Sequence, residues 1–144
     1  MKKILFIFLL IQISLSVCAQ KTNWAATHNW KIYRLSGKQA YSYSVDTLSN
    51  FKSAKMGDST IIAYLAQSKS LPKGKGSFWM GVFIATYETS DKKLNKVALS
   101  NYGGFFFDFS SKVYYELPEK SRQSWYTLIN QSLEKVFEGK NHLE

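Results

Sequence analysis

Apolar positions in the second half of the chain alternate with polar ones or form short continuous runs. The strongest run extends from Phe78 to Thr89 and is apolar at both odd and even positions. Because successive side chains of a strand point to opposite faces, this run predicts a central strand that is covered on both sides. Residues 94–100 predict a weaker neighbouring strand in which Lys96 is exposed.

A second strand pair is predicted around a turn at Ser110-Ser111, with strands over residues 105–109 and 112–117. In that register, the two faces of the hairpin are fully specified. One face carries Phe105, Phe107, Phe109, Tyr114 and Glu116, and the other carries Phe106, Asp108, Val113 and Tyr115. Asp108 and Glu116 therefore point to opposite faces, so they cannot serve as the paired carboxylates of a glycosidase, which lie ~5–9.5 Å apart across one bond.

The first half of the chain predicts strands and then helices. Residues 30–35 and 40–45 predict a β-hairpin around Ser36-Gly37. Apolar residues over 46–56 fall near helical spacing, and residues 58–66 predict a second helix that Asp58 or Ser59 caps. Leu71-Pro72 ends this region, because the residue before a proline avoids helical dihedral angles.

A long amphipathic helix is predicted after Pro118, which suits a first helical turn, and Gly139 is placed to stop it. Its apolar stripe consists of Trp125, Leu128, Ile129, Leu133, Val136 and Phe137. The predicted order is ββ-α(α)-ββββ-α. This order indicates an α+β domain with a mainly antiparallel sheet of five or six strands packed with the C-terminal helix.

The first residues, MKKILFIFLLIQISLSVCAQ, are typical of a secretory signal peptide. Two lysines precede a short apolar run, and small residues mark a cleavage point between Ala19 and Gln20. We therefore expect a periplasmic or secreted protein. The predicted organisation is a signal peptide over 1–19, a flexible lead-in over 20–29, a single domain over 30–139 and a tail over 140–144.

Two other interpretations of the leader remain open. The leader could stay uncleaved, although its apolar run is shorter than the ~20 residues of a membrane span. Alternatively, Leu15-Ser16-Val17-Cys18 resembles a bacterial lipobox with lipid on Cys18, with Val17 as the departure from that pattern. Cys18 is the only cysteine, so cleavage after Ala19 leaves no disulfide and no thiolate.

The chain is basic, with 19 Lys and Arg against 10 Asp and Glu and a formal charge of +9. Such a balance favours anionic partners, although it also serves solubility. Positive charge concentrates around Lys69, Lys73 and Lys75, which we consider a candidate site for an acidic partner. The alternative is a solvated connecting loop. Nucleic acid is not an expected partner, because the chain has only two arginines and an export signal.

No catalytic set, metal site or cofactor motif is recognisable. The two histidines, His28 and His142, lie near the two ends of the predicted mature chain. A zinc site would need both of them plus carboxylates, and a Ser-His-Asp triad would have to recruit one. No cofactor is therefore expected.

Aromatic residues make up 16% of the chain, more than one face of a hairpin needs. Tyr102, Phe106 and Tyr115 are candidates for an exposed recognition patch, with burial in the core as the alternative. Together these features predict an exported, non-enzymatic binding module whose partner is a protein or an anionic envelope component. Two alternatives are an envelope hydrolase with a pocket that gathers Asp108, Glu88 or His28, and a lipid-anchored structural protein.

Overall fold

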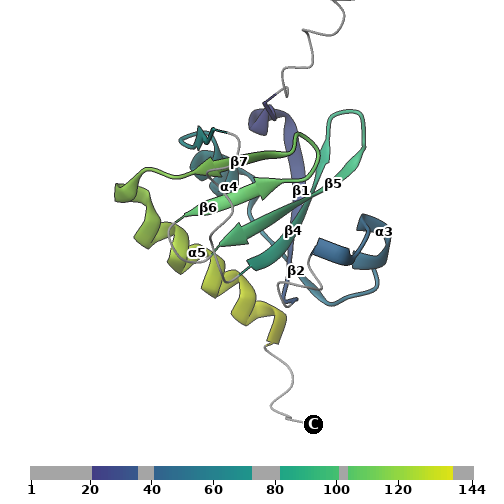
Figure 1. The fold of residues 1–144 in the computed structure, drawn as a ribbon. Helices are drawn as coiled ribbons and strands as arrows, with labels where there is room; N and C mark the ends of the chain where they lie inside the picture. The colour runs from purple at the N-terminus through teal and green to yellow at the C-terminus, as the bar shows by residue number, and fades with distance from the viewer. Residues whose placement is uncertain (1–20, 36–40, 73–81, 101–103, 138–144) are drawn as a thin grey trace, which may run out of the picture.

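The computed structural model describes residues 21–35, 41–72, 82–100 and 104–137, which form a seven-stranded antiparallel sheet with a helical layer (Figure 1). The strands are β1 (Thr27–Tyr33), β2 (Ser53–Lys55), β3 (Lys69–Ser70), β4 (Val82–Thr89), β5 (Leu94–Ser100), β6 (Phe105–Asp108) and β7 (Val113–Glu116). The helices are the 3-10 turn η1 (Trp24–Ala26), α3 (Val45–Leu48), α4 (Asp58–Leu65) and α5 (Glu119–Phe137). The predicted α+β class and antiparallel sheet are confirmed, with seven strands in place of five or six.

The strand order across the sheet is β2-β1-β4-β5-β6-β7-β3. Strands β4 to β7 are neighbours both in the chain and in the sheet, because short turns join antiparallel strands. The predicted hairpin of β6 and β7 is confirmed, with Phe105 opposite Glu116 and Asp108 opposite Val113. The prediction that β4 is covered on both faces is also confirmed, since Ile84, Ala85, Thr86 and Tyr87 are all buried.

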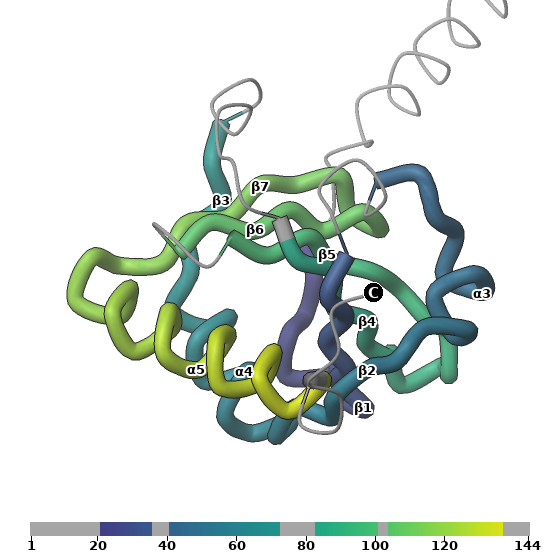
Figure 2. The backbone as a smooth tube through the Cα atoms, turned by 90° about the horizontal axis from the view of Figure 1, so that it is seen from below, coloured from purple at the N-terminus to yellow at the C-terminus, as the bar shows by residue number. Residues whose placement is uncertain are grey.

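Helices α4 and α5 lie side by side on one face of the sheet (Figure 2). The ring of Tyr64 on α4 meets that of Trp125 on α5, with their centroids 5.6 Å apart. Trp125 is fully buried, and its indole N–H donates a hydrogen bond to the carbonyl oxygen of Ser100 at 2.8 Å. The apolar stripe of α5 thus seals the main core, and α5 occupies the predicted position after Pro118.

The residues before β1 belong to the folded domain, so the prediction of a flexible lead-in over 20–29 is wrong for the described residues of that range. Trp24 is only 6% exposed and lies at the centre of the main core. Its ring centroid lies between 5.3 and 6.2 Å from those of Trp30, Tyr87, Phe106 and Tyr115. Trp24 has no apolar neighbours at strand or helix spacing, so the sequence does not predict its burial among these four rings.

The predicted hairpin of residues 30–35 and 40–45 is also wrong. Strand β1 instead pairs with β2 and β4, and the chain forms the short helix α3 at Val45. Ser44 caps this helix by accepting a hydrogen bond from the backbone N–H of Thr47. The predicted helix over 46–56 is therefore split into α3 and β2, because Leu48 and Met56 are buried in different parts of the core.

We expect Trp24→Ala to lower the free energy of unfolding by about 3–5 kcal/mol, because it removes a large buried ring that touches four others. Chemical denaturation followed by circular dichroism measures this loss. Lys21→Ala, an exposed change three residues away, is the matched control and should leave the unfolding curve unchanged. Equal stability of the Trp24 variant and the parent would contradict the packing role of Trp24.

Candidate functional site

The face of the sheet opposite α4 and α5 carries a continuous row of rings that are only partly buried. We define the aromatic face as Tyr41, Phe105, Phe107, Phe109 and Tyr114. The centroid of the Phe107 ring lies 4.4 Å from that of Tyr114 and 4.9 Å from that of Phe109. Tyr41 meets Phe109 edge-on at 5.4 Å and is itself 45% exposed. Four of the five rings are thus in a connected chain that reaches solvent.

Strand alternation and the position of the helices explain why these rings stay partly exposed. Phe106 and Tyr115 point toward the helical layer, so Phe105, Phe107 and Tyr114 point the other way. A smaller cluster around Leu48 of α3 covers Ile84 and Ala98 on this second face. Phe107 and Phe109 only border that cluster, so the surface over β6 and β7 is half-covered.

Two cations sit against the aromatic face. The Lys96 amine lies 4.3 Å from the centroid of the Phe109 ring and donates hydrogen bonds to the carbonyl oxygens of Tyr41 and Tyr43, at 3.2 and 2.7 Å. Lys96 is therefore half-buried rather than exposed as expected, and this burial lowers its pKa. The Arg122 guanidinium lies 5.6 Å from the Phe105 ring centroid. The rings and these two cations form a mixed aromatic and cationic surface.

Two of the three candidates for an exposed recognition patch are core residues. Phe106 is fully buried and Tyr115 is only 3% exposed, so the alternative of burial in the core holds for both, and neither belongs to an exposed patch. Their rings stack in the main core with centroids 5.0 Å apart, because this face of the hairpin packs toward Trp24 and Trp125. Burial removes both side chains from contact with any partner.

The remaining predicted binding residues are not brought together by the described part of the chain. Lys69 is exposed on the short edge strand β3, and its backbone lies opposite that of Glu116 in the ladder with β7. Tyr102, Lys73 and Lys75 lie outside the described residues, as do His142 and the predicted cleavage point at Ala19 and Gln20.

Asp108 is the most heavily hydrogen-bonded side chain of the hairpin and is fully buried. Its carboxylate accepts hydrogen bonds from the hydroxyls of Tyr87, Ser110 and Ser111, at 2.8, 2.7 and 2.6 Å. The backbone amides of both serines add two more, at 3.3 and 3.1 Å, and the Thr22 hydroxyl adds another. These donors satisfy the buried carboxylate of Asp108. Asp108 therefore acts as a structural anchor for the turn and for the N-terminal segment.

The contact with Asp108 also contributes to the protonation state of Tyr87. Burial first, and the nearby negative charge of Asp108 second, raise the pKa of the Tyr87 phenol far above its usual range. Tyr87 therefore stays protonated and keeps donating to Asp108.

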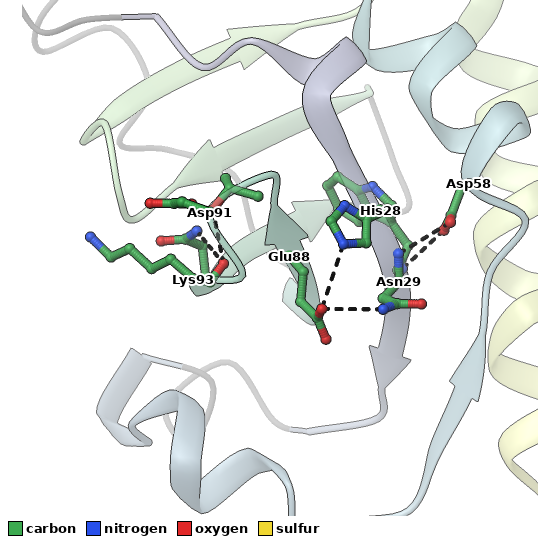
Figure 3. A network of polar contacts seen from close by, with 9 residues as sticks. His28, Asn29, Asp58, Glu88, Asp91 and Lys93 are labelled. Carbon is green, nitrogen blue, oxygen red and sulfur yellow. Dashed lines mark hydrogen bonds and ion pairs between the residues drawn. The ribbon is translucent and has the colours of Figure 1, made fainter.

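A bulge in β1 brings together two of the residues that were considered for a hydrolase (Figure 3). His28 Nε2 lies 3.6 Å from Glu88 Oε2, which also accepts a hydrogen bond from the Asn29 side-chain amide at 3.2 Å. Asn29 has a left-handed backbone with φ of 54°. Asp58 accepts hydrogen bonds from the backbone amides of Asn29 and Trp30, both at 3.1 Å. These contacts cap the bulge.

The third residue considered for that pocket does not join the pair. Tyr87 points to the helical layer with Asp108, so Glu88 projects from the opposite face of β4. Within the described ranges, no group of three His, Cys, Asp or Glu side chains could hold a metal ion. The described part of the chain also contains no helix with the length and apolar character of a bilayer span.

Comparison with protein-family models, with curated proteins and with solved structures found no match to this chain. The sequence analysis assigned Phe105, Phe107, Phe109 and Tyr114 to one face correctly. It missed Tyr41, Lys96 and Arg122, which reach that face from distant segments. The signal in the sequence for the aromatic face was the number of aromatic residues, which is larger than one helical layer covers.

We expect Asp108→Asn to destabilise the protein by at least about 2 kcal/mol, because an amide group would face donors that need an acceptor. Denaturant titration measures the change. Glu134→Gln, an exposed carboxylate-to-amide change on α5, is the control and should leave the midpoint unchanged. Unaltered stability of the Asp108 variant would contradict the anchoring role.

The raised pKa of Tyr87 predicts that stability declines as pH rises above about 10, the pKa of an unfolded tyrosine. Above that pH the unfolded state releases the phenol proton while the folded state retains it, so unfolding becomes more favourable. Unfolding free energies between pH 9 and pH 11 should therefore depend less on pH in Tyr87→Phe than in the parent. Tyr64→Phe is the control, because it removes a phenol whose ring packs on Trp125. The prediction would be contradicted if the unfolding free energy of Tyr87→Phe depended on pH as steeply as that of the parent.

Proposed function

We propose that this protein is an exported binding module that recognises a protein partner through its aromatic face. The observation that carries the proposal is a connected row of partly buried rings, Tyr114, Phe107 and Phe109, that ends at Tyr41, which is 45% exposed. A domain of this size usually places such rings inside. Contiguous exposed apolar surface on a soluble domain is typical of an interaction site.

The composition of the aromatic face fits a protein interface. Tyrosine, phenylalanine and arginine are enriched at the centres of such interfaces, and large rings there contribute most of the binding free energy. Lys96 and Arg122 lie against rings of this face, and the Arg122 guanidinium is also paired with the Glu116 carboxylate at 2.5 Å. A partner with an apolar centre and a mixed polar rim complements this arrangement.

The edges of the sheet favour binding through the aromatic face over binding by addition of a strand. The outer strands β2 and β3 have three and two residues, so they offer a partner strand few unpaired groups. Next to β2, the backbone amides of Asn29 and Trp30 at the β1 bulge already donate to Asp58. Binding by addition of a strand therefore has little to build on.

The envelope hydrolase has less support. His28 and Glu88 lie together, but their contacts cap a bulge, and Asp108 is buried on the other side of the sheet. Export remains part of the proposal on the strength of the leader over residues 1–19. The lipid-anchored form predicts an acylated Cys18, whereas cleavage after Ala19 predicts Gln20 as the first residue.

Site-specific photocrosslinking tests the binding proposal in the cell that exports the protein. A photoreactive phenylalanine analogue replaces Tyr41 or Phe109 on the aromatic face. The control replaces Gln131, which is exposed on α5. We expect one adduct of defined mass from both face positions and none from Gln131.

The same partner, once purified, allows a quantitative test. Tyr41→Ser should weaken its affinity at least about tenfold, because Tyr41 is the most exposed ring of the aromatic face and truncation of a tyrosine hot spot costs about 2 kcal/mol or more. Adducts that form equally at Gln131, or no adduct at either face position, would contradict the proposal.

A further inference from the structure

One ring of the aromatic face comes from a distant part of the chain. Phe105, Phe107, Phe109 and Tyr114 belong to β6, to β7 or to the turn between them, whereas Tyr41 precedes α3. Tyr41 is also the only exposed member of the face, since the other four rings are partly buried. The most accessible ring is therefore placed by tertiary contacts and not by the hairpin itself.

Lys96 on β5 joins this distant segment to the sheet. Its amine donates hydrogen bonds to the carbonyl oxygens of Tyr41 and Tyr43, which precede it by 55 and 53 residues. The same amine lies over the ring of Phe109, and the Tyr41 ring meets the Phe109 ring edge-on. One ammonium group thus contacts both members of this ring pair, the first through its backbone and the second through its ring face.

The register of the sheet explains how Lys96 reaches these groups. Lys96 lies opposite Thr86 and points to the same face as Ala98, because alternate residues of a strand share a face. Thr86 and Ala98 are fully buried, so the lysine stem rises from a covered floor toward the segment above it. A partly buried ammonium needs acceptors, and the two carbonyl oxygens and the ring face supply them.

These contacts fit a role inside the domain better than a direct contact with a partner. A lysine amine has three N–H donors, and two of them are used by Tyr41 and Tyr43. An acidic group of a partner would have to displace these carbonyl oxygens from the amine. The charge of Lys96 therefore serves the arrangement of the aromatic face.

We propose that Lys96 is a positioning residue, which holds Tyr41 against Phe109 in the orientation that the protein partner recognises. This inference rests on the proposed function, because it assigns Lys96 a role at the same site. Lys96 acts through Tyr41 and does not touch the partner. A ring that is already held in its bound position loses less conformational entropy on binding, so Lys96 raises the affinity without adding contact area.

Nuclear magnetic resonance relaxation of 15N-labelled protein tests the positioning without any partner. Lys96→Met keeps an apolar stem and removes the charge and the donors. In the parent, we expect backbone order parameters of about 0.85 at residues 41–43, the value of rigid backbone, and in Lys96→Met we expect values below about 0.6. The order parameters of α5 should stay unchanged, because the loss is local.

Two further variants separate this role from general effects of charge. Lys31→Met is the matched control, since Lys31 is exposed and lies opposite Thr86 on the other side of β4 from Lys96. It removes the same charge from the same face and should leave residues 41–43 ordered. Lys96→Arg keeps the charge and the N–H donors, so it should also keep this segment ordered.

A double-mutant cycle tests the link to recognition. The probe is the protein that the photoreactive analogue at Phe109 captures, once it has been purified. Lys96→Met should weaken its affinity by no more than Tyr41→Ser does. In the Tyr41→Ser background, Lys96→Met should weaken it by less than about twofold, because the two changes remove one shared contribution.

Several results would overturn the proposal. Unchanged order parameters in Lys96→Met, or an equal loss in Lys31→Met or Lys96→Arg, would show that the ammonium does not hold the segment. A loss that extends to α5 would show general destabilisation, and a full effect of Lys96→Met in the Tyr41→Ser background would show direct contact with the partner. Failure to capture any partner would contradict the proposed function, whereas the relaxation data would still decide whether Lys96 positions Tyr41.

Discussion

The structure depends on one geometric constraint, which is that a single helical layer covers only one face of a seven-stranded sheet. Helices α4 and α5 both pack on the face that carries Trp30, Phe106 and Tyr115. Among the described residues, α3 and the chain around it cover Ile84 and Ala98 on the second face. The rings over β6 and β7 are left half-covered as a result, and the proposed binding surface follows from that asymmetry.

A second feature ties the N-terminal segment to the core and to the β6–β7 hairpin. Trp24 fills the space between four rings of the core, and Thr22 completes the hydrogen bonds of Asp108. The N-terminal segment is thus held by apolar packing and by a buried carboxylate together.

Local signals were sufficient where the sequence pattern matched one element. The β6–β7 register followed from strand alternation around two serines, and α5 followed from its apolar stripe and Pro118. Prediction failed where a residue served a distant contact. Residues 40–45 alternate like a strand, yet the chain turns into α3 so that Leu48 reaches the core. The predicted helix over 46–56 failed for the same reason.

The sequence by itself determined the α+β class, the antiparallel hairpin with its two faces, and the amphipathic C-terminal helix. Each depends on the alternation or spacing of neighbouring residues, which is a local property. Only the tertiary structure decided which hairpin face is buried, since both carry rings and the choice depends on where α4 and α5 pack. It also decided that Trp24 belongs to the core, because contacts between distant segments leave no periodic trace in a single chain.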